Sequence, residues 1–325
     1  MKPTRIAVII NSFNRLALLQ NCLRALAEWL PNEAINIQTT IFIYDAASND
    51  GTIEWLKDEC QMPLDIQTID GKNDQDTSFS AGLNKAATIA SEQIPELDYL
   101  LFYETDNEIN SFEAIAQALH VLSADKSLAA CGFTVSRHDG SAAGAGMPFP
   151  KISHFLMGKK IVHRFQLEQI PYVWTQHNEA QFSFADVVFT SPLLVKHAAW
   201  TESTGLNALH YPFSDCDVDW AKRLRLAGWR MGVVKRSDVI HDNSDSLSNW
   251  SQQRALHFHR ARLRYFKCYQ PIRTRLLWPH MFALRHLTEL LIIFLFVRNP
   301  ERKAHLKFIA KNLLKSVFKS YEPQS

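Results

Sequence analysis

Apolar residues follow two alternating patterns along the first part of the chain. Short runs rich in β-branched residues predict strands at Arg5–Phe13, at Thr39–Tyr44 and within Asp98–Asp106. Helical periodicity predicts helices between them, at Leu16–Leu30 before Pro31, from about Thr52, and from about Ser80 to Ser91. Strands that alternate with helices are typical of βαβ units, so the pattern predicts an α/β fold with a mainly parallel sheet.

The second part of the chain carries weaker signals of the same kind. Phe182–Val195 reads as one or two strands, Asp217–Ala227 as an amphipathic helix ended by Gly228, and Arg230–Asp242 as a strand. The small residues of Asp139–Met147 predict a loop. Its Ala-Gly-Ala-Gly run has no strand–turn–helix frame around it, which argues against a dinucleotide-binding motif.

Polar residues follow the strands at the edge where α/β sheets bind their ligands. Asn11, Asp45, Glu104 and Asp106 all occupy such positions. Glu104 and Asp106 are one residue apart, so on an extended chain their side chains point the same way, roughly 6–7 Å apart. Two adjacent anions repel unless a cation lies near them. The pair therefore indicates either a cation site or the start of a solvated loop.

Length and composition are those of a globular protein. The 325 residues are 46% hydrophobic and 21% charged, enough for one large or two modest domains. The N-terminus leads directly into a strand pattern and shows no small-residue cleavage site. The five cysteines are scattered and form no CxxC pair, which fits a reducing compartment and gives no zinc site. We therefore expect a cytoplasmic protein.

Charge divides the chain into two parts. Residues 250–325 hold 15 Lys+Arg against 3 Asp+Glu, and the totals of 35 and 33 leave 20 against 30 for residues 1–249. This asymmetry predicts a domain over residues 1–249 and a basic helical extension over residues 250–325. No nucleic-acid-binding motif accompanies the basic residues, so we expect no nucleic acid partner.

The extension predicts contact with a membrane surface. One helical face is formed by Leu306, Ile309, Ala310, Leu313, Leu314, Val317 and Phe318. Lysines run beside this face, as in helices that lie in a membrane surface, although the same face could pack on the protein instead. The longest apolar stretch, Leu287–Val297, falls short of the roughly 20 residues that a spanning helix needs.

Four stretches in one order resemble the family 2 glycosyltransferases with a GT-A fold. The first strand leads to a turn with Asn14 and Arg15, and the second ends in the motif Asp45-x-x-Ser48-x-Asp50-Gly51-Thr52. Glu104-Thr105-Asp106 matches the DXD motif of that family. Asp217 and Asp219 precede a helix with the Arg-Leu-x-x-x-Gly-aromatic pattern at Arg223–Trp229, and His241 matches a later strand-end histidine. The resemblance covers about Arg5 to Ser246.

The resemblance implies a nucleotide-sugar site. Glu104, Asp106 and His241 would hold Mg²⁺ or Mn²⁺, a hard cation that carboxylates and phosphates share. The implied donor is of the UDP or dTDP type, in contact with Asn11, Asn14, Asp45, Ser48, Asp50 and Thr105. Asp217 would be the general base that takes the proton of an acceptor hydroxyl, with inversion at the anomeric carbon. The acceptor would be a glycan or a lipid-linked sugar of surface polysaccharide biosynthesis.

Three positions depart from the family pattern. Cys216 stands where the family has a glutamate, Glu104 where an aspartate is usual, and Thr190-Ser191 where a glycine is usual. A non-catalytic relative that binds a nucleotide or sugar on a membrane scaffold is one alternative. A nucleotidyltransferase is the other, although the basic glycine-rich loop expected after its first strand is missing.

Overall fold

The computed structural model describes residues 2–30, 36–177, 179–241 and 252–318, and the chain forms two compact units. The first unit comprises Met1–Phe149, Ile170–Ala208 and Cys216–Asn243, and the second comprises Pro150–Gln169, Leu209–Asp215 and Ser244–Ser325. The domain boundary expected at residue 249 lies outside the described residues, as does Pro31. Two segments assigned to the first domain from the sequence belong to the second unit.

A nine-stranded sheet forms the core of the first unit. Its order is β10-β11-β14-β6-β13-β4-β1-β2-β3, and β11 and β13 run against the direction of the other strands. Its strands are β1 (Thr4–Ser12), β2 (Ile37–Asp45), β3 (Ile66–Asp70), β4 (Tyr99–Phe102), β6 (Leu128–Phe133), β10 (Thr175–His177), β11 (Ala180–Ala185), β13 (Leu193–Lys196) and β14 (Arg230–Val234). The prediction of an α/β fold with a largely parallel sheet is confirmed.

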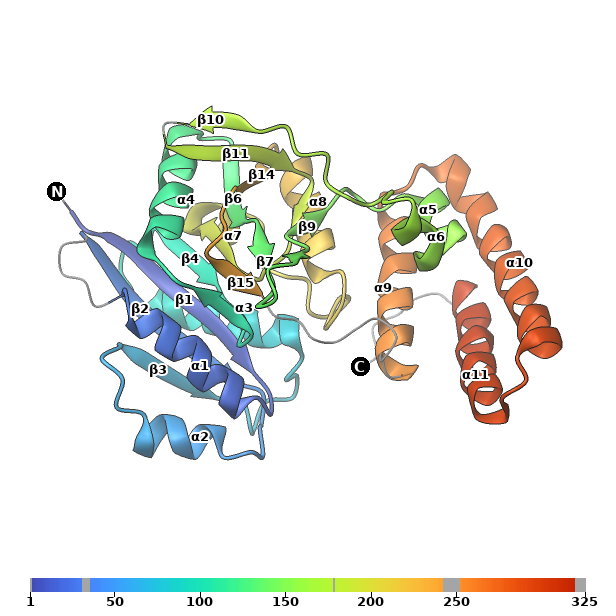
Figure 1. Ribbon diagram of the computed structural model, residues 1–325, viewed down its shortest axis with the longest axis horizontal. Coiled ribbons are helices and arrows are strands. Elements are labelled where there is room, and N and C mark those ends of the chain that lie inside the picture. The colour runs from blue at the N-terminus through green and yellow to red at the C-terminus, as the bar shows by residue number, and fades with distance from the viewer. Residues whose placement is uncertain (1, 31–35, 178, 242–251, 319–325) are drawn as a thin grey trace. The chain divides into compact units, whose positions relative to one another are not determined.

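Helices cover the sheet because their apolar residues fall on one face (Figure 1). In α1 (Leu16–Ala27), Leu19, Cys22, Leu23 and Leu26 are buried. Small residues line α3 (Phe79–Gln93) where it packs on β1 and β2. A Cβ on Gly82 would lie 2.5 Å from Cδ1 of Tyr44, so only glycine allows this close approach.

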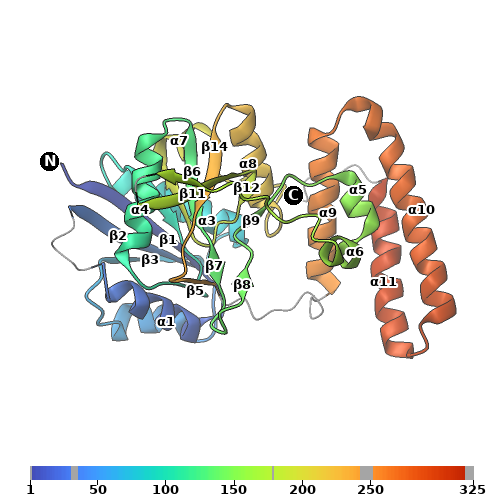
Figure 2. The same cartoon turned by 45° about the horizontal axis from the view of Figure 1, so that its top comes forward.

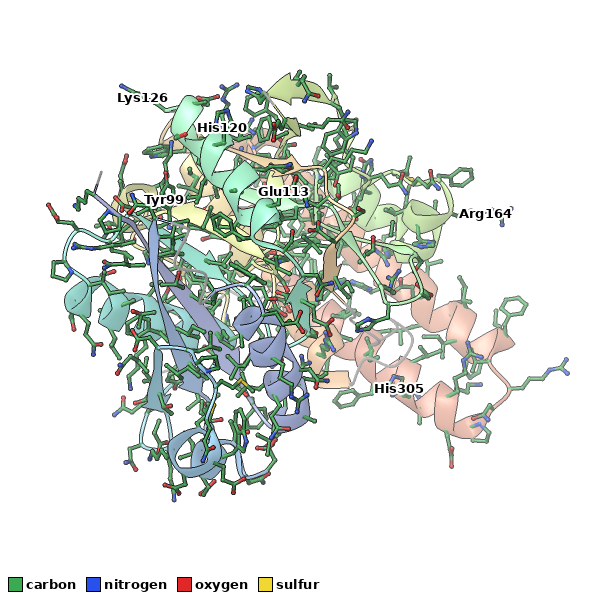
Figure 3. All side chains as sticks on the ribbon, turned by 60° about the vertical axis from the view of Figure 1, so that its left-hand side comes forward. Tyr99, Glu113, His120, Lys126, Arg164 and His305 are labelled. Carbon is green, nitrogen blue, oxygen red and sulfur yellow. The ribbon has the colours of Figure 1, made fainter. Side chains whose placement is uncertain are left out.

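Five further helical segments complete the first unit. They are α2 (Thr52–Glu54), the π-helical turn η1 (Trp55–Glu59), α4 (Phe112–Ala124), α7 (His197–Glu202) and α8 (Cys216–Leu226). The left-handed Gly228 (φ +93°) follows α8, as the sequence predicted. Glu113 lies in the first turn of α4, and Lys126, just beyond its last residue, projects into solvent (Figure 3).

A smaller sheet joins segments that are distant in the sequence. Its order is β5 (Asn107–Ile109), β15 (Val239–His241), β7 (Val135–Ser136) and β8 (Ala142–Ala143). The expectation of one strand over Arg230–Asp242 is wrong, because the chain turns between β14 and β15, where Arg236 exchanges hydrogen bonds with the Thr134 hydroxyl. The loop expected at Asp139–Met147 contains β8 and β9 (Gly146–Met147), and β9 pairs with β12 (Val187–Val188).

The second unit is helical. It contains α5 (Ile152–Met157), α6 (Lys159–Arg164), α9 (Gln252–Tyr269), α10 (Ile272–Phe296) and α11 (Pro300–Val317), shown also in Figure 2. The ring of Phe155 packs on Phe266 and Phe282, with centroids 5.7 Å and 5.2 Å away. Buried Asp215 accepts two hydrogen bonds from Arg262, at 2.7 Å and 3.0 Å.

The structure bears on two expectations about the basic extension. Leu276–Phe296 of α10 is long and apolar enough to cross a membrane, and only 11% of its apolar window is buried, so the judgement that no stretch is long enough is wrong. The apolar face of α11 is partly covered within the unit, since Ala310, Leu313 and Val317 are buried while Lys307, Lys311 and Lys315 are exposed. The large exposed apolar surface therefore lies on α10.

Candidate functional site

Three predicted metal ligands meet at one edge of the first unit. Glu104 and Asp106 lie between β4 and β5, and His241 ends β15. The antiparallel pairing of β15 with β5 sets His241 opposite Asn107, directly beside Asp106. One ligand atom from each of the three side chains lies within 4.8 Å of the others, and His241 Nε2 is 3.5 Å from Asp106 Oδ1.

The turn that carries the two acids is held by Asn107, a residue that the sequence analysis did not single out. Its buried Oδ1 accepts hydrogen bonds from the Glu104 N–H at 2.8 Å and from the Ser191 hydroxyl at 2.9 Å. Asparagine is a common turn-forming residue, so its position directly after the acidic pair is the feature of the sequence that could have indicated this role. Ser191, noted as a departure from the family pattern, thus supports the acidic turn.

The site carries excess negative charge. Burial, together with repulsion from Asp106 and Asp217, raises the pKa of Glu104 from its ordinary value of 4.5 to about 8, and the Arg15 guanidinium opposes this shift. Arg15 Nη1 lies 3.3 Å from Asp106 Oδ2. Asp106 Oδ1 is buried and accepts no hydrogen bond from the described residues.

These features fit a divalent cation. Two carboxylates and an imidazole provide oxygen and nitrogen ligands, and the charge of a cation would offset the repulsion between Glu104 and Asp106. The donor set suits Mg²⁺ or Mn²⁺, and it does not distinguish between them.

The predicted base lies within electrostatic reach of Glu104. Asp217 lies in the first turn of α8, half-buried, and its Oδ1 accepts a hydrogen bond from the Val218 N–H at 2.9 Å. Its charge contributes to the raised pKa of Glu104, which places it within electrostatic reach of the acidic pair. Cys216 is buried beside it, and Asp219 forms an ion pair with Arg223 at 2.9 Å.

Asp45 is a buried carboxylate at the same edge of the sheet. Oδ1 accepts a hydrogen bond from the Ser48 N–H at 2.8 Å, and the buried Oδ2 has no partner within the described ranges. Burial raises the pKa of Asp45, and the hydrogen bonds from Ser48 oppose this. An unpaired buried oxygen is suited to accept a hydrogen bond from a nucleoside hydroxyl or N–H group.

Asn14, Ser48 and Asp50 connect two loops. The Asn14 N–H donates to Ser48 Oγ and its side-chain oxygen accepts from the Asn49 N–H, each at 2.8 Å. Asp50 accepts from the Leu16 N–H at 2.9 Å and from the Thr52 hydroxyl at 2.6 Å. These contacts give the motif a structural role in joining the two loops, as its turn-forming residues allow.

The other residues predicted to contact the nucleotide-sugar differ in their surroundings. Thr105 is buried, and Asn11 is half-buried, with an Oδ1 that accepts no hydrogen bond from described residues. Asn84 of α3 instead forms hydrogen bonds with the backbone of Leu206 through both ends of its amide. Lys85 pairs with Asp74 at 2.7 Å.

Comparison with known proteins gives two findings. The model of the family described as "Glycosyl transferase family 2" matches residues 7–173. The fold is similar to that of a mannosyltransferase from Pyrobaculum calidifontis, solved in complex with GDP-Man and Mn²⁺. That match has a TM-score of 0.54 at 14% identity and covers 97% of this chain and 86% of the other. A search of curated proteins found no match.

Proposed function

Since the chain belongs to glycosyl transferase family 2, we propose that it is a metal-dependent inverting enzyme that moves a sugar from a nucleotide-diphosphate donor to an acceptor hydroxyl. The observation that carries the proposal is the convergence of Glu104, Asp106 and His241, with Asp217 within electrostatic reach of Glu104. Glu104, Asp106 and His241 would hold Mg²⁺ or Mn²⁺. When bound, the ion supplies positive charge to the diphosphate that leaves.

Asp217 would act on the acceptor. Its carboxylate takes the hydroxyl proton while the acceptor oxygen bonds to the anomeric carbon and the bond from that carbon to the diphosphate breaks. One displacement without a covalent enzyme intermediate inverts the configuration. Arg15, 3.3 Å from Asp106, adds a cation beside the expected diphosphate, and Asp45 Oδ2 would accept a hydrogen bond from the nucleoside.

Calorimetric titration of nucleoside diphosphates tests this proposal. We expect UDP or dTDP to bind in the presence of Mn²⁺, with GDP included because the structurally similar mannosyltransferase was solved with GDP-Man. Asp106→Asn should weaken Mn²⁺-dependent binding at least tenfold, and Asp58→Asn, at an exposed acid of η1, should leave it unchanged. Diphosphate binding that needs neither Mn²⁺ nor Asp106 would overturn the metal site.

We also propose that the protein is cytoplasmic and lies on the inner face of the cell membrane, where a glycan or lipid-linked acceptor of surface polysaccharide synthesis would be present. An exposed apolar face of α10 supports this, formed by Leu277, Met281, Leu284, Leu291 and Leu295. Arg285 and Glu289 of α10 contact their own unit instead. Arg285 binds Glu289 at 2.9 Å and the Phe155 carbonyl, and Glu289 binds buried His286 at 2.7 Å.

This arrangement favours a helix that lies along the surface over one that spans the bilayer, because one side of α10 is already occupied by protein contacts. Exposed Arg298, Arg302 and Lys307 follow the apolar face and would attract anionic lipids. Co-sedimentation with phosphatidylglycerol vesicles tests the contact. Leu284→Glu should reduce binding strongly, and Leu226→Glu, at an exposed leucine of α8, should not. Equal binding of the two variants would contradict it.

A further inference from the structure

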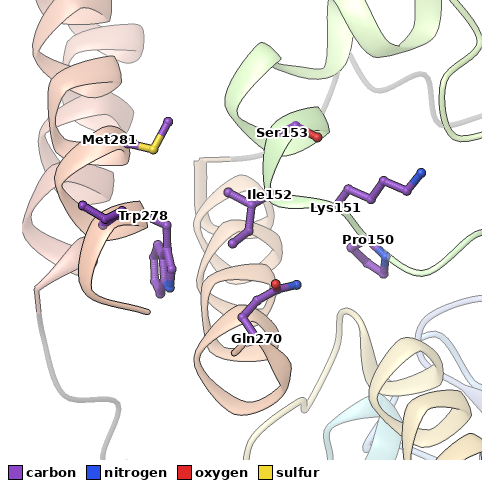
Figure 4. A pocket seen from close by; sticks show the side chains of 8 residues that line it. Pro150, Lys151, Ile152, Ser153, Gln270, Trp278 and Met281 are labelled. Atoms are coloured by element: carbon purple, nitrogen blue, oxygen red, sulfur yellow. The ribbon is translucent and has the colours of Figure 1, made fainter. Parts of the chain in front are cut away.

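The proposed reaction uses neither of two further features of the described residues. In the helical unit, an open groove lies among α5, the end of α9 and α10, with apolar walls at Trp278 and Met281 (Figure 4). None of the side chains that line it selects one class of ligand. In the first unit, Arg236 and Asp238 form a polar cluster directly before β15, the strand that ends in His241. This cluster lies next to the metal site in the chain and has a definite geometry.

Asp238 is the centre of the cluster. Arg236 donates two parallel hydrogen bonds to its carboxylate, from Nε to Oδ1 and from Nη2 to Oδ2, each at 2.8 Å. The Ser111 hydroxyl donates to Oδ2 at 2.6 Å, and the Asn110 N–H donates to the Asp238 carbonyl at 3.2 Å. Burial raises the pKa of Asp238, yet the hydrogen bonds from Arg236 and Ser111 bring it below its ordinary value. The carboxylate is therefore charged at neutral pH.

Arg236 is itself fixed to the central sheet. The hydroxyl of Thr134, the residue after β6, donates to the Arg236 carbonyl and accepts from its N–H, both at 2.6 Å. The guanidinium is 12% exposed, and its Nη1 lies 3.2 Å from Glu113 Oε1 in the first turn of α4. Arg236 therefore connects the turn between β14 and β15 with both β6 and α4.

β5, the partner strand of β15, is held in place without this cluster. The Ile109 N–H donates to the Tyr103 hydroxyl, and the Ile109 carbonyl accepts from the Trp29 indole, each at 2.7 Å. β15 has less support of its own, because it is three residues long and pairs with β7 at one position, Ile240 with Ser136. Such a short strand forms few ladder hydrogen bonds, so its register needs a further source of specificity.

The register of β15 decides where His241 points. The antiparallel pairing sets His241 opposite Asn107, directly beside Asp106. Side chains along a strand alternate between its two faces, so a slip of one residue would turn the imidazole away from Asp106. Asp238 is hydrogen-bonded to Asn110 at the end of β5. A slip would break this contact and the side-chain hydrogen bonds of the cluster with it.

We propose that Arg236 is a positioning residue of the metal site, which together with Asp238 fixes the register of β15 on β5 and thereby directs His241 toward Asp106. Arg236 and Asp238 act through the strand and do not touch the ion. The inference rests on the proposed function, because it assigns His241 to the metal. Outer residues that orient a metal ligand typically contribute 10–100-fold to metal affinity.

Calorimetric titration of Mn²⁺ into the full chain tests this role. We expect Arg236→Met to weaken Mn²⁺ binding about tenfold, and Arg236→Lys, which keeps the charge without the two parallel hydrogen bonds, to weaken it less. In a His241→Ala background, Arg236→Met should change the affinity less than twofold, because its effect passes through His241. Arg230→Met is the matched control. Arg230 pairs with Asp125 at 2.9 Å in the same unit, and its loss should leave Mn²⁺ affinity unchanged.

Amide hydrogen exchange in EDTA gives a measurement that does not depend on the metal. Val239–His241 should exchange faster in Arg236→Met than in wild type, and Thr4–Ser12 of β1 should exchange at the same rate in both. Unchanged exchange in β15, or equal losses of Mn²⁺ affinity with and without His241, would overturn the proposal. If wild-type protein binds no Mn²⁺ but β15 exchanges faster in the variant, the proposed metal site fails and the register role of Arg236 stands.

Discussion

His241 Nε2 lies 3.5 Å from Asp106 Oδ1, although the two residues are far apart in the sequence. The pairing of β15 with β5 brings them together, so the geometry of the site depends on a two-strand contact in the smaller sheet. Ion binding, protonation and folding of this region should therefore be linked.

The first prediction concerns the pH dependence of metal binding. The pKa of Glu104 is raised to about 8, so in the metal-free protein this side chain is protonated at pH 7 and must release its proton when Mn²⁺ binds. We expect Mn²⁺ affinity to rise about fivefold between pH 7 and pH 8 and about tenfold by pH 9, where it levels off. Titration of Mn²⁺ at several pH values measures this. Glu104→Gln should bind Mn²⁺ more weakly at pH 8 with a much flatter pH profile, and an unchanged slope would assign the proton to another group.

The same shift affects the stability of the metal-free protein. The folded state holds the Glu104 proton more tightly than the unfolded chain, so this contribution is complete below pH 4.5 and is lost as the pH rises to about 8. Thermal unfolding in EDTA should therefore show a Glu104-dependent loss of stability between these values. Added Mn²⁺ should oppose the loss at pH 8. A difference between wild type and Glu104→Gln that does not vary with pH would contradict the prediction.

Arg15 should set the position of this pH profile. Burial and Asp106 raise the pKa of Glu104, and the Arg15 guanidinium opposes both. Arg15→Gln should therefore move the midpoint of Mn²⁺ binding to higher pH, and Arg15→Lys should restore much of the wild-type value. Calorimetry across pH 7–9 gives the midpoint. An Arg15→Gln profile that overlies the wild-type profile would show that this charge does not act on Glu104.

Asp217 should affect the chemical step and leave donor binding intact. Removal of a general base typically lowers the rate 10²–10⁴-fold. We expect Asp217→Asn to lower the hydrolysis of the preferred nucleotide-sugar, with water as acceptor, by about this factor. Calorimetry should show Mn²⁺-dependent nucleotide affinity within about threefold of wild type, since the base acts on the acceptor. A large loss of nucleotide affinity with little change in rate would assign Asp217 to donor binding instead.

The ion pair of Asp215 with Arg262 should be important for the helical unit. Both side chains are almost fully buried, and removal of one charge from such a pair typically costs about 3–5 kcal/mol. Asp215 has a left-handed φ of +58°, which asparagine tolerates, so Asp215→Asn tests the charge with little backbone strain. Limited proteolysis of the helical unit measures the effect. The double variant Asp215→Asn with Arg262→Met should recover part of the stability that Asp215→Asn loses. Losses of stability that add in the double variant would argue against coupling between the two residues.

The sequence predicts the architecture well where the signals are local. The β-branched run of β1 and the leucine face of α1 produce the elements expected, and the acidic pair follows β4 at the ligand-binding edge. Asn107 and the β5–β15 pairing were not predictable in the same way, because β5 and β15 are three residues each and their contact is long-range.

The helical extension shows the same limit. Periodicity identified the apolar face of α11, but only the packing of the unit shows that Ala310, Leu313 and Val317 are buried and that α10 is the helix with the large exposed apolar face. Burial within a helical unit depends on which neighbours cover each face, and a single sequence does not specify this. Periodicity therefore located an apolar face but not whether the rest of the unit covers it.

The discontinuous second unit has a consequence for synthesis on the ribosome. Phe155 of α5 packs against Phe282 of α10, so a ring made early in translation acquires its partner only after most of the remaining chain has been made. At about 5–20 residues per second, this delay is roughly 6–25 s. During that interval the apolar side of the nascent α5 segment is uncovered. Premature termination ahead of α9 should therefore release an aggregation-prone polypeptide. Folding of the helical unit depends on complete synthesis of its last helices.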